Sequence, residues 1–196
     1  MVRGSLGAAF LTLMLVANGA AAAKPPTVID AALRAQLMDA VKASDSFDDR
    51  FSAEVWLADM SDRLNRFAPR ALPDVQERLG FLRLLHSEAT RAQVNPELVL
   101  AVIDIESRFD RFAVSNTGAL GYMQIMPFWL REVGRPYDNL FKPGINLRLG
   151  CTILKYYLDR EGGNLVRALM AYNGGPEKSK YADKVLNSLS FRWFRQ

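Results

Sequence analysis

The stretch Asn95–Glu106 reads NPELVLAVIDIE and predicts a helix with a clear start. Asn95 is a favourable N-cap residue, because its side-chain oxygen can accept a hydrogen bond from a free N–H group of the first turn. Pro96 suits the first helical position, where the N–H group that proline lacks would be unpaired in any case. Glu97 favours the positive end of the helix dipole. We therefore expect a helix that begins at Pro96 and carries Glu106 near its C-terminal end.

Glu106 lies on the apolar stripe of this helix, because positions i, i+3, i+4 and i+7 are Val99, Val102, Ile103 and Glu106. Loss of hydration disfavours the charged carboxylate and raises its pKa, and the negative end of the helix dipole acts in the same direction. A carboxyl group that keeps its proton near neutral pH can donate it to a leaving group. The alternative is a structural ion pair with Arg108 or Arg111, and this helix alone does not decide between the two.

The opposite face of the same helix carries Glu97, Ala101, Asp104 and Arg108. Asp104 and Arg108 are four residues apart, so we expect a solvated ion pair between them.

Helical patterns also dominate the rest of the chain, which predicts an all-α or α-dominated α+β fold. The expected further helices are residues 28–42, 52–67, 74–94, 128–133, 146–160, 165–172 and 179–189. No stretch shows sustained strand alternation. Short extended pieces are expected between residues 113 and 124, where Gly118 and Gly121 interrupt the helical pattern.

Residues 1–23 have the order of a signal peptide. Arg3 is followed by an apolar run at 6–16 and by small residues that end at Ala23. The run is shorter than the ~20 residues that span a bilayer, which disfavours the alternative of an uncleaved anchor, and no cysteine for lipid attachment lies nearby. We expect a protein exported to the periplasm, soluble and without a stable membrane span after cleavage.

Composition argues against several other kinds of site. The net charge of +4 comes from lysines and arginines that are scattered rather than clustered with aromatic residues, so nucleic-acid binding is not expected. The single cysteine, Cys151, lies at helical spacing among leucines, which predicts a buried core residue rather than a reactive thiol. The single histidine, His86, has no partner at metal-ligand spacing. We expect no disulfide, no metal and no cofactor.

Three short segments follow Glu106 and are typical of one site: residues 115–127, 144–146 and 171–176. With them the chain resembles the soluble lytic transglycosylases, relatives of goose-type lysozyme. The family pattern of Glu-Ser, Gly-Leu-Met-Gln-Ile and Ala-Tyr-Asn-Ala-Gly is present as Glu106-Ser107, Gly121–Ile125 and Ala171–Gly175. The departures are Tyr122 for leucine and Gly174 for alanine.

The resemblance covers about residues 74–189 and implies a lysozyme-like domain. We expect a catalytic domain at 74–196, preceded by an extension of extra helices at 24–73.

The resemblance also implies roles for single residues. Glu106 would be the one catalytic carboxylate, with Ser107 and Gln124 holding the acid and the sugar, and Met123 forming an apolar wall of the groove. The Tyr172 hydroxyl would lie near Glu106, to stabilise its charged form or to orient an N-acetyl group, and Asn173 would bind sugar hydroxyls or amides.

Four further positions keep two interpretations each. Asn146 is interpreted either as a substrate-binding residue or as the cap of the helix that follows it. Tyr181 is expected either to reach the groove or to pack in the core. Trp129 and Phe128 stack on sugar rings or, as their helical spacing favours, pack in the core.

The implied reaction is cleavage of the bond between N-acetylmuramic acid and N-acetylglucosamine without water, with a 1,6-anhydro product. Most glycosidases need two carboxylates, and the candidates for a second, Asp104 and Asp110, are poorly placed. Two alternatives stay open: a hydrolase of lysozyme type, and a wall-binding scaffold for a secretion apparatus. Peptidoglycan strands are the expected partner in each case, with secretion or cell-wall machinery as a second one.

Overall fold

The computed structural model describes residues 50–132, 135–174 and 178–194. The signal peptide expected at 1–23 and the helix expected at 28–42 lie outside these residues. The described part consists of α2 (Arg50–Phe67), α3 (Val75–Arg91), α4 (Pro96–Glu106), α5 (Phe128–Glu132), α6 (Pro143–Arg160), α7 (Leu165–Asn173), α8 (Lys178–Ser188) and the π-helical turn η1 (Leu189–Trp193). The all-α fold class is therefore confirmed.

Local capping fixes several of the helix ends. The Asn95 side chain accepts a hydrogen bond from the Leu98 N–H at 2.8 Å, as expected for the start of α4. Asn164 caps α7 in the same way through the Arg167 N–H, and α7 ends where Gly174 adopts a left-handed φ of 64°. The start expected for α6 was wrong by three residues. This helix begins at Pro143, with Lys142 as its N-cap residue, because proline is well suited to the first position.

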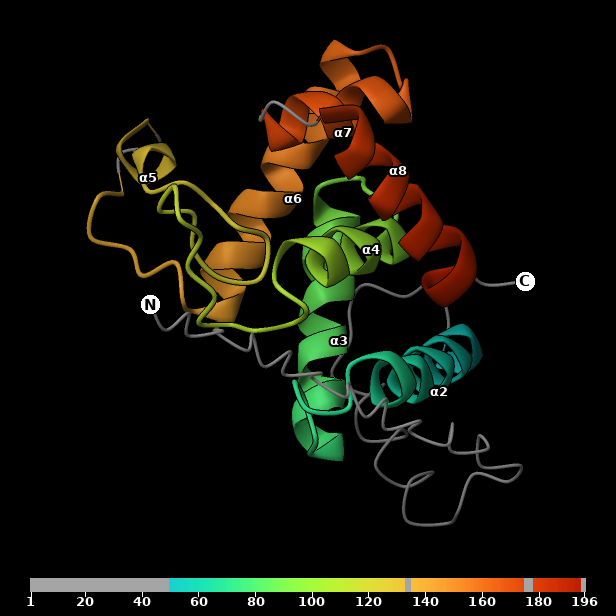
Figure 1. Cartoon of the computed structure of the whole chain (residues 1–196). Coiled ribbons are helices and arrows are strands. Elements are labelled where there is room, and N and C mark those ends of the chain that lie inside the picture. Colours follow the sequence, from blue (N-terminus) through green and yellow to red (C-terminus); the bar gives the residue numbers. More distant parts are fainter. Residues whose placement is uncertain (1–49, 133–134, 175–177, 195–196) are drawn as a thin grey trace, which may run out of the picture.

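Helix α4 lies at the centre of the fold, with α3, α8 and η1 packed against it (Figure 1). Every residue from Leu98 to Asp104 is buried. The division of α4 into an apolar and a solvated face was therefore wrong, since neighbours cover both faces.

Asp104 shows the consequence most clearly. Its side chain is 1% exposed, and its Oδ2 atom accepts hydrogen bonds from Ser188 Oγ at 2.6 Å and from the Arg192 guanidinium at 2.7 Å. Arg108 lies beyond the end of α4, with a left-handed φ of 55°. The solvated Asp104–Arg108 pair is thus replaced by a buried link from α4 to the C-terminal segment.

The hydrophobic core is continuous from α2 to η1. Helix α2 contributes Ala53, Trp56, Leu57, Met60 and Leu64 to it. The C-terminal turn contributes Trp193, which is fully buried beside the rings of Phe67 and Phe109. Cys151 is buried in α6, which agrees with its interpretation as a core residue. Along the described ranges, no helix combines the length and the apolar character needed to cross a membrane.

The segment between α4 and α5 is irregular but tightly turned. Isolated antiparallel bridges join Val114 to Leu120 and Leu120 to Ile125, so the short extended pieces expected here are present. The turns need left-handed backbone at Gly118, Gly121 and Gln124, whose φ angles are 85°, 74° and 49°. This segment folds back over the end of α4 and so forms one wall of the candidate site.

Candidate active site

A cavity of about 240 Å³ opens at the C-terminal end of α4. Its lining comes from α4, the following irregular segment and helices α5 to α7, namely Glu106, Ser115, Thr117, Ala119, Gln124, Ile125, Met126, Trp129, Ile153, Tyr157, Tyr172 and Asn173. Glu106 is the one carboxylate among these residues.

Glu106 is half-buried, and one strong hydrogen bond holds it. The Tyr181 hydroxyl, from α8, donates to Glu106 Oε1 at 2.7 Å. Burial raises the pKa of Glu106 from 4.5 to about 7, and the Tyr181 hydrogen bond opposes the rise. Among the residues that the structure describes, no arginine pairs with Glu106, so the structural ion pair with Arg108 or Arg111 is absent.

The tyrosine that contacts the acid is not the one expected from the motif. The Tyr172 hydroxyl donates instead to the Met123 carbonyl at 2.8 Å. Tyr172 still lines the cavity, and burial together with the nearby charge of Glu106 raises its pKa well above 10. Tyr172 thus fastens the irregular segment to α7, and Tyr181 is not merely a packing residue but the partner of Glu106.

Gln124 lies in the cavity wall and is fixed by the segment around it. Its side-chain amide donates to the carbonyls of Ala113 at 3.2 Å and Gly121 at 2.9 Å. Both donated bonds are internal, so the side-chain oxygen is the atom left to meet a ligand.

Three other residues expected at the site lie behind its wall. Ser107 Oγ donates to the Tyr122 carbonyl at 2.8 Å, and Met123 is fully buried. Asn146 is 1% exposed. Its oxygen accepts from the Met123 N–H, and its nitrogen donates to the carbonyls of Leu120 and Leu140, all at 2.8 to 2.9 Å.

The side-chain amide of Asn146 therefore forms its hydrogen bonds within the protein. It neither caps a helix nor faces the cavity as a binding group. Met123 likewise does not line the cavity, where Met126 and Ile125 form the apolar wall instead. Ser107, Met123 and Asn146 together hold the irregular segment against α4 and α6.

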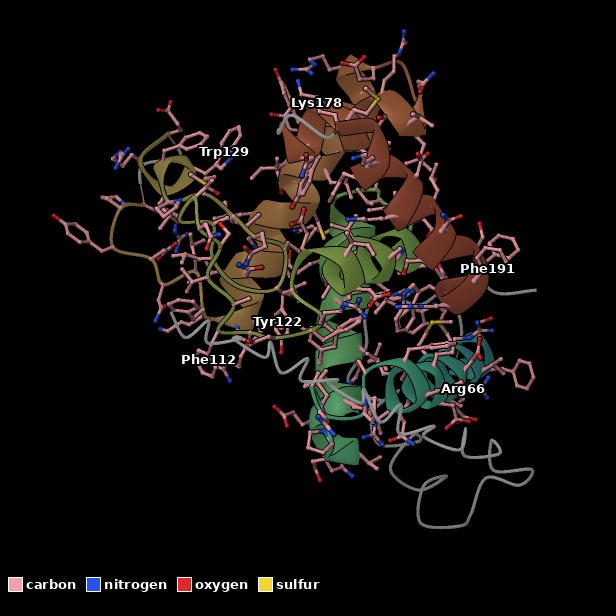
Figure 2. All side chains as sticks on the ribbon, in the orientation of Figure 1. Arg66, Phe112, Tyr122, Trp129, Lys178 and Phe191 are labelled. Carbon is pink, nitrogen blue, oxygen red and sulfur yellow. The ribbon has the colours of Figure 1, made fainter. Side chains whose placement is uncertain are left out.

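The cavity is also lined by residues that were not expected at the site. Ser115 and Met126 lie within the recognised segment 115–127, so the motif contained the signal for them. Ile153 and Tyr157 are one turn apart on α6, where nothing in the sequence distinguishes them from core residues. Trp129, which belongs to α5, is half-buried and lines the cavity (Figure 2). Asn173 lines the cavity as expected.

A half-buried carboxyl group with a pKa near neutrality is suited to proton transfer. Trp129, Tyr157 and Tyr172 add aromatic side chains to the lining of the same cavity. In the described part of the chain, no group of three histidine, cysteine, aspartate or glutamate side chains could hold a metal ion.

Comparison with known proteins gives an independent view of the same region. The model of the "Transglycosylase SLT domain" family matches residues 83–190. The chain is 36% identical over 99 residues to "Transglycosylase" of Enterobacteria phage PRD1, covering 50% of this chain and 36% of that protein. It is 32% identical over 111 residues to "Membrane-bound lytic murein transglycosylase C" of Yersinia pestis (strain Pestoides F), covering 48% of this chain and 31% of that protein. The chain thus spans about a third of the length of these relatives.

Proposed function

Since the chain belongs to the transglycosylase SLT domain family, we propose that it is an enzyme that cleaves the glycan strands of peptidoglycan, with Glu106 as its acid. The observation that carries the proposal is the single carboxyl group in the cavity, half-buried, with a pKa raised to about 7 and a hydrogen bond from Tyr181. A pure binding protein has no need for a carboxyl group in this state.

In the first step, protonated Glu106 donates its proton to the glycosidic oxygen between N-acetylmuramic acid and N-acetylglucosamine. The bond from this oxygen to the muramoyl C1 atom breaks, and the leaving sugar departs with a hydroxyl group. The acetamido group of the substrate stabilises the positive charge that develops at C1. Glu106 is now charged, and the Tyr181 hydroxyl stabilises this form by its hydrogen bond.

In the second step, Glu106 takes the proton of the muramoyl C6 hydroxyl, and the C6 oxygen bonds to C1. The product is a 1,6-anhydro ring, no water is consumed, and Glu106 is protonated again. This sequence needs one carboxylate, which matches the described lining of the cavity. A hydrolase would need a second group to activate water, and retaining or inverting glycosidases take that group from a second carboxylate.

For the remaining site residues we propose two kinds of role. Gln124, Asn173 and Tyr172 line the cavity and would bind the sugar. Ser107, Met123 and Asn146 would act indirectly, by holding the wall that carries Gln124. Residues 1–23 would direct export to the periplasm, 24–73 would form an extension and 74–196 the catalytic domain, with cell-wall remodelling as the setting and a secretion or cell-wall machine as a further partner.

The test is digestion of purified peptidoglycan sacculi, with the soluble products identified by mass. The wild-type protein should release products lighter by one water molecule than those of a hydrolase, and Glu106→Gln should release none. Glu132→Gln, the same change at an exposed glutamate of α5, is the control and should keep full activity. Products of hydrolytic mass would replace the proposal by the lysozyme-type reaction, and binding without any release would favour the scaffold.

A further inference from the structure

Asp104 is a buried carboxylate that the proposed reaction does not use. Its side chain is 1% exposed, and its Oδ2 atom accepts hydrogen bonds from Ser188 Oγ at 2.6 Å and from the Arg192 guanidinium at 2.7 Å. Ser188 Oγ in turn accepts a hydrogen bond from Trp193 Nε1 at 3.0 Å. Apolar side chains of similar volume often stabilise a core as well as a buried ion pair does, whereas charge-assisted hydrogen bonds fix one geometry. We call Asp104, Ser188 and Arg192 the Asp104 cluster, and infer from its chemistry that it holds its helices in one position.

Two points of attachment join α8 to α4. Ser188 follows Tyr181 by seven residues, so the two lie on one face of α8, about two turns or ~10 Å apart. Tyr181 donates to Glu106 at 2.7 Å, and Ser188 donates to Asp104 at 2.6 Å. Val185, between them on the same face, is fully buried. Because α8 is held at both points, a slide or rotation on α4 would break at least one of the two hydrogen bonds.

The hydrogen bond at Glu106 is sensitive to the position of α8. Burial raises the pKa of Glu106 to about 7, and the hydrogen bond from Tyr181 opposes the rise. Hydrogen bonds weaken steeply as their distance and angle depart from the ideal, so a small rotation of α8 would weaken this opposition while Glu106 stays buried. Tyr172, which also interacts with the charge of Glu106, is held by the Met123 carbonyl at 2.8 Å and would not replace the lost bond.

Helix α2 is connected to the same cluster. Arg63 donates to the Arg192 carbonyl at 2.8 Å, and the Arg192 guanidinium lies 5.6 Å from the centre of the Phe67 ring. Figure 1 shows α8 passing α4 and ending close to α2, with which η1 is in contact. Both α2 and Arg192 lie outside residues 83–190, which the family model matches. A chain of contacts thus leads from outside the matched region to the helix that carries the acid.

On these grounds, and resting on the proposed function, we propose that the Asp104 cluster positions the Tyr181 hydroxyl on Glu106. It does so by fixing the place of α8 on α4, and Arg63 supports it from α2. None of the cluster residues lines the Glu106 cavity, so their effect reaches the substrate only through the acid. Loss of the cluster should therefore change the proton equilibrium of Glu106 and kcat, but not KM.

The first experiment follows Glu106 directly and without substrate. In full-length protein with isotope-labelled glutamate carboxyl carbons, its signal is assigned by its absence in Glu106→Gln and is followed by NMR against pH. Ser188→Ala removes one bond of the cluster and no charge. It should raise the pH midpoint of the Glu106 titration by about 0.5, because a weaker Tyr181 bond lowers the pKa less. Ser61→Ala removes another buried serine hydroxyl, which accepts from Arg78 at 3.4 Å, and should leave the midpoint unchanged.

A double variant tests whether Ser188 acts through Tyr181. Tyr181→Phe should raise the midpoint more than Ser188→Ala does, because it removes the hydroxyl itself. Once the hydroxyl is absent, the position of α8 no longer affects the acid. The variant with both substitutions should therefore titrate like Tyr181→Phe alone.

Activity and a variant in α2 complete the test. On soluble glycan strands, Ser188→Ala should lower kcat about threefold with KM unchanged. Arg63→Met removes the contact of α2 with η1 but keeps an unbranched stem. Its side chain is partly exposed, so it guards against a folding defect in Ser188→Ala, and it should raise the Glu106 midpoint in the same direction by a smaller amount. Arg66→Met, the same change about one turn further along α2, should leave the midpoint as it is.

Three results would overturn the inference. The first is an unchanged Glu106 midpoint in both Ser188→Ala and Arg63→Met. The second is an equal shift in Ser188→Ala and Ser61→Ala, since a general loosening of the core would then be the cause. The third is additive shifts in the double variant, since Ser188 would then act without Tyr181. The titration needs no substrate, so a wild-type protein that releases nothing from sacculi would refute the proposed function and leave the result on the Asp104 cluster standing.

Discussion

The hydrogen bond between Tyr181 and Glu106 joins residues that lie 75 positions apart in the chain. Burial, and then the neighbouring carboxylate, raises the pKa of Tyr181 well above 10, so this hydroxyl stays protonated and remains a donor throughout the physiological range. Glu106 therefore always meets a group that favours its charged form, while burial favours its neutral form. A pKa of about 7 is the balance of these two effects.

Replacing Tyr181 by phenylalanine removes one side of this balance. The pKa of Glu106 should rise further above 7, because the hydrogen bond that lowers it is lost. The alkaline limb of kcat/KM should move to higher pH, and kcat should fall about tenfold or more, since a hydrogen bond to a charged group contributes about 1.5–3 kcal/mol. A pH–rate profile on peptidoglycan measures both effects. Tyr137→Phe, at a position 98% exposed, is the control. An alkaline limb that does not shift in Tyr181→Phe would contradict the effect assigned to the Tyr181 hydrogen bond.

The raised pKa of Glu106 also predicts a cost in stability. Between its unfolded value of 4.5 and its folded value of about 7, the folded state binds more protons than the unfolded state. The contribution of Glu106 to the free energy of unfolding is therefore complete below about pH 4.5 and is lost as the pH rises through about 7. At pH 8 the loss amounts to about 3 kcal/mol.

The glutamine side chain of Glu106→Gln does not ionise, so this variant should not lose stability as the pH rises. The variant should be more stable than wild type at pH 8, by up to about 3 kcal/mol, and of similar stability at pH 4. Denaturant unfolding at the two pH values measures the difference. A variant less stable than wild type at pH 8 would show that the charged carboxylate is better accommodated than its burial indicates.

At the scale of elements, the irregular segment between α4 and α5 depends on one crowded glycine. Gly121 has a φ of 74°, and a Cβ atom there would lie 2.5 Å from Asn146 Nδ2 and 2.7 Å from the Leu140 carbonyl. Gly118 has a similar φ of 85° but nothing within 4 Å of its would-be Cβ. Substitutions at the two positions therefore separate the cost of backbone strain from the cost of a steric clash.

Gly121→Ala should therefore destabilise the protein by about 2–4 kcal/mol, from strain and from the displaced Asn146 amide. Gly118→Ala should cost only about 1 kcal/mol, since strain is its whole effect. Thermal unfolding of the two variants gives the comparison. Gly121→Ala should also lose activity, because Asn146 holds the segment that carries Gln124. Equal losses of stability in the two variants would mean that the segment rearranges around residue 121 and avoids the clash.

The ion pair of Asp104 with Arg192 and its hydrogen bond from Ser188 show how the elements around the site are held together. They tie α4, which carries Glu106, to the end of α8, which carries Tyr181. The acid and its hydrogen-bond partner therefore stand on two helices whose relative position is fixed at a buried carboxylate.

At the scale of the whole molecule, the C-terminal turn closes the core. Trp193 is fully buried against α2 and the segment after α4, through its ring contacts with Phe67 and Phe109. Trp193→Ala should destabilise the protein by about 3–5 kcal/mol, as measured by denaturant unfolding. Phe191→Ala, two residues away but 80% exposed, should change stability by less than about 0.5 kcal/mol. A small effect of Trp193→Ala would mean that the core does not depend on this turn.

Sequence signals were enough to predict the helical class, the approximate helix bounds and the selection of Glu106, which lies in the cavity. These follow from local signals: caps such as Asn95, prolines at helix starts, a period of 3.6 residues, and three motifs in fixed order. The sequence did not place Asp104 or Met123 correctly, because a helix or segment covered on all sides shows no periodic division between inside and outside.

Tertiary structure alone decided which tyrosine meets Glu106, that Asp104 is buried, and that Met126 rather than Met123 lines the cavity. The contacts of Glu106 with Tyr181 and of Asp104 with Ser188 and Arg192 span 75, 84 and 88 residues. Caps and helical periods act over one or two turns, so they fix each helix without fixing its neighbours. The packing of α8 and η1 on α4 sets these partners, and the burial that it produces gives Glu106 its raised pKa.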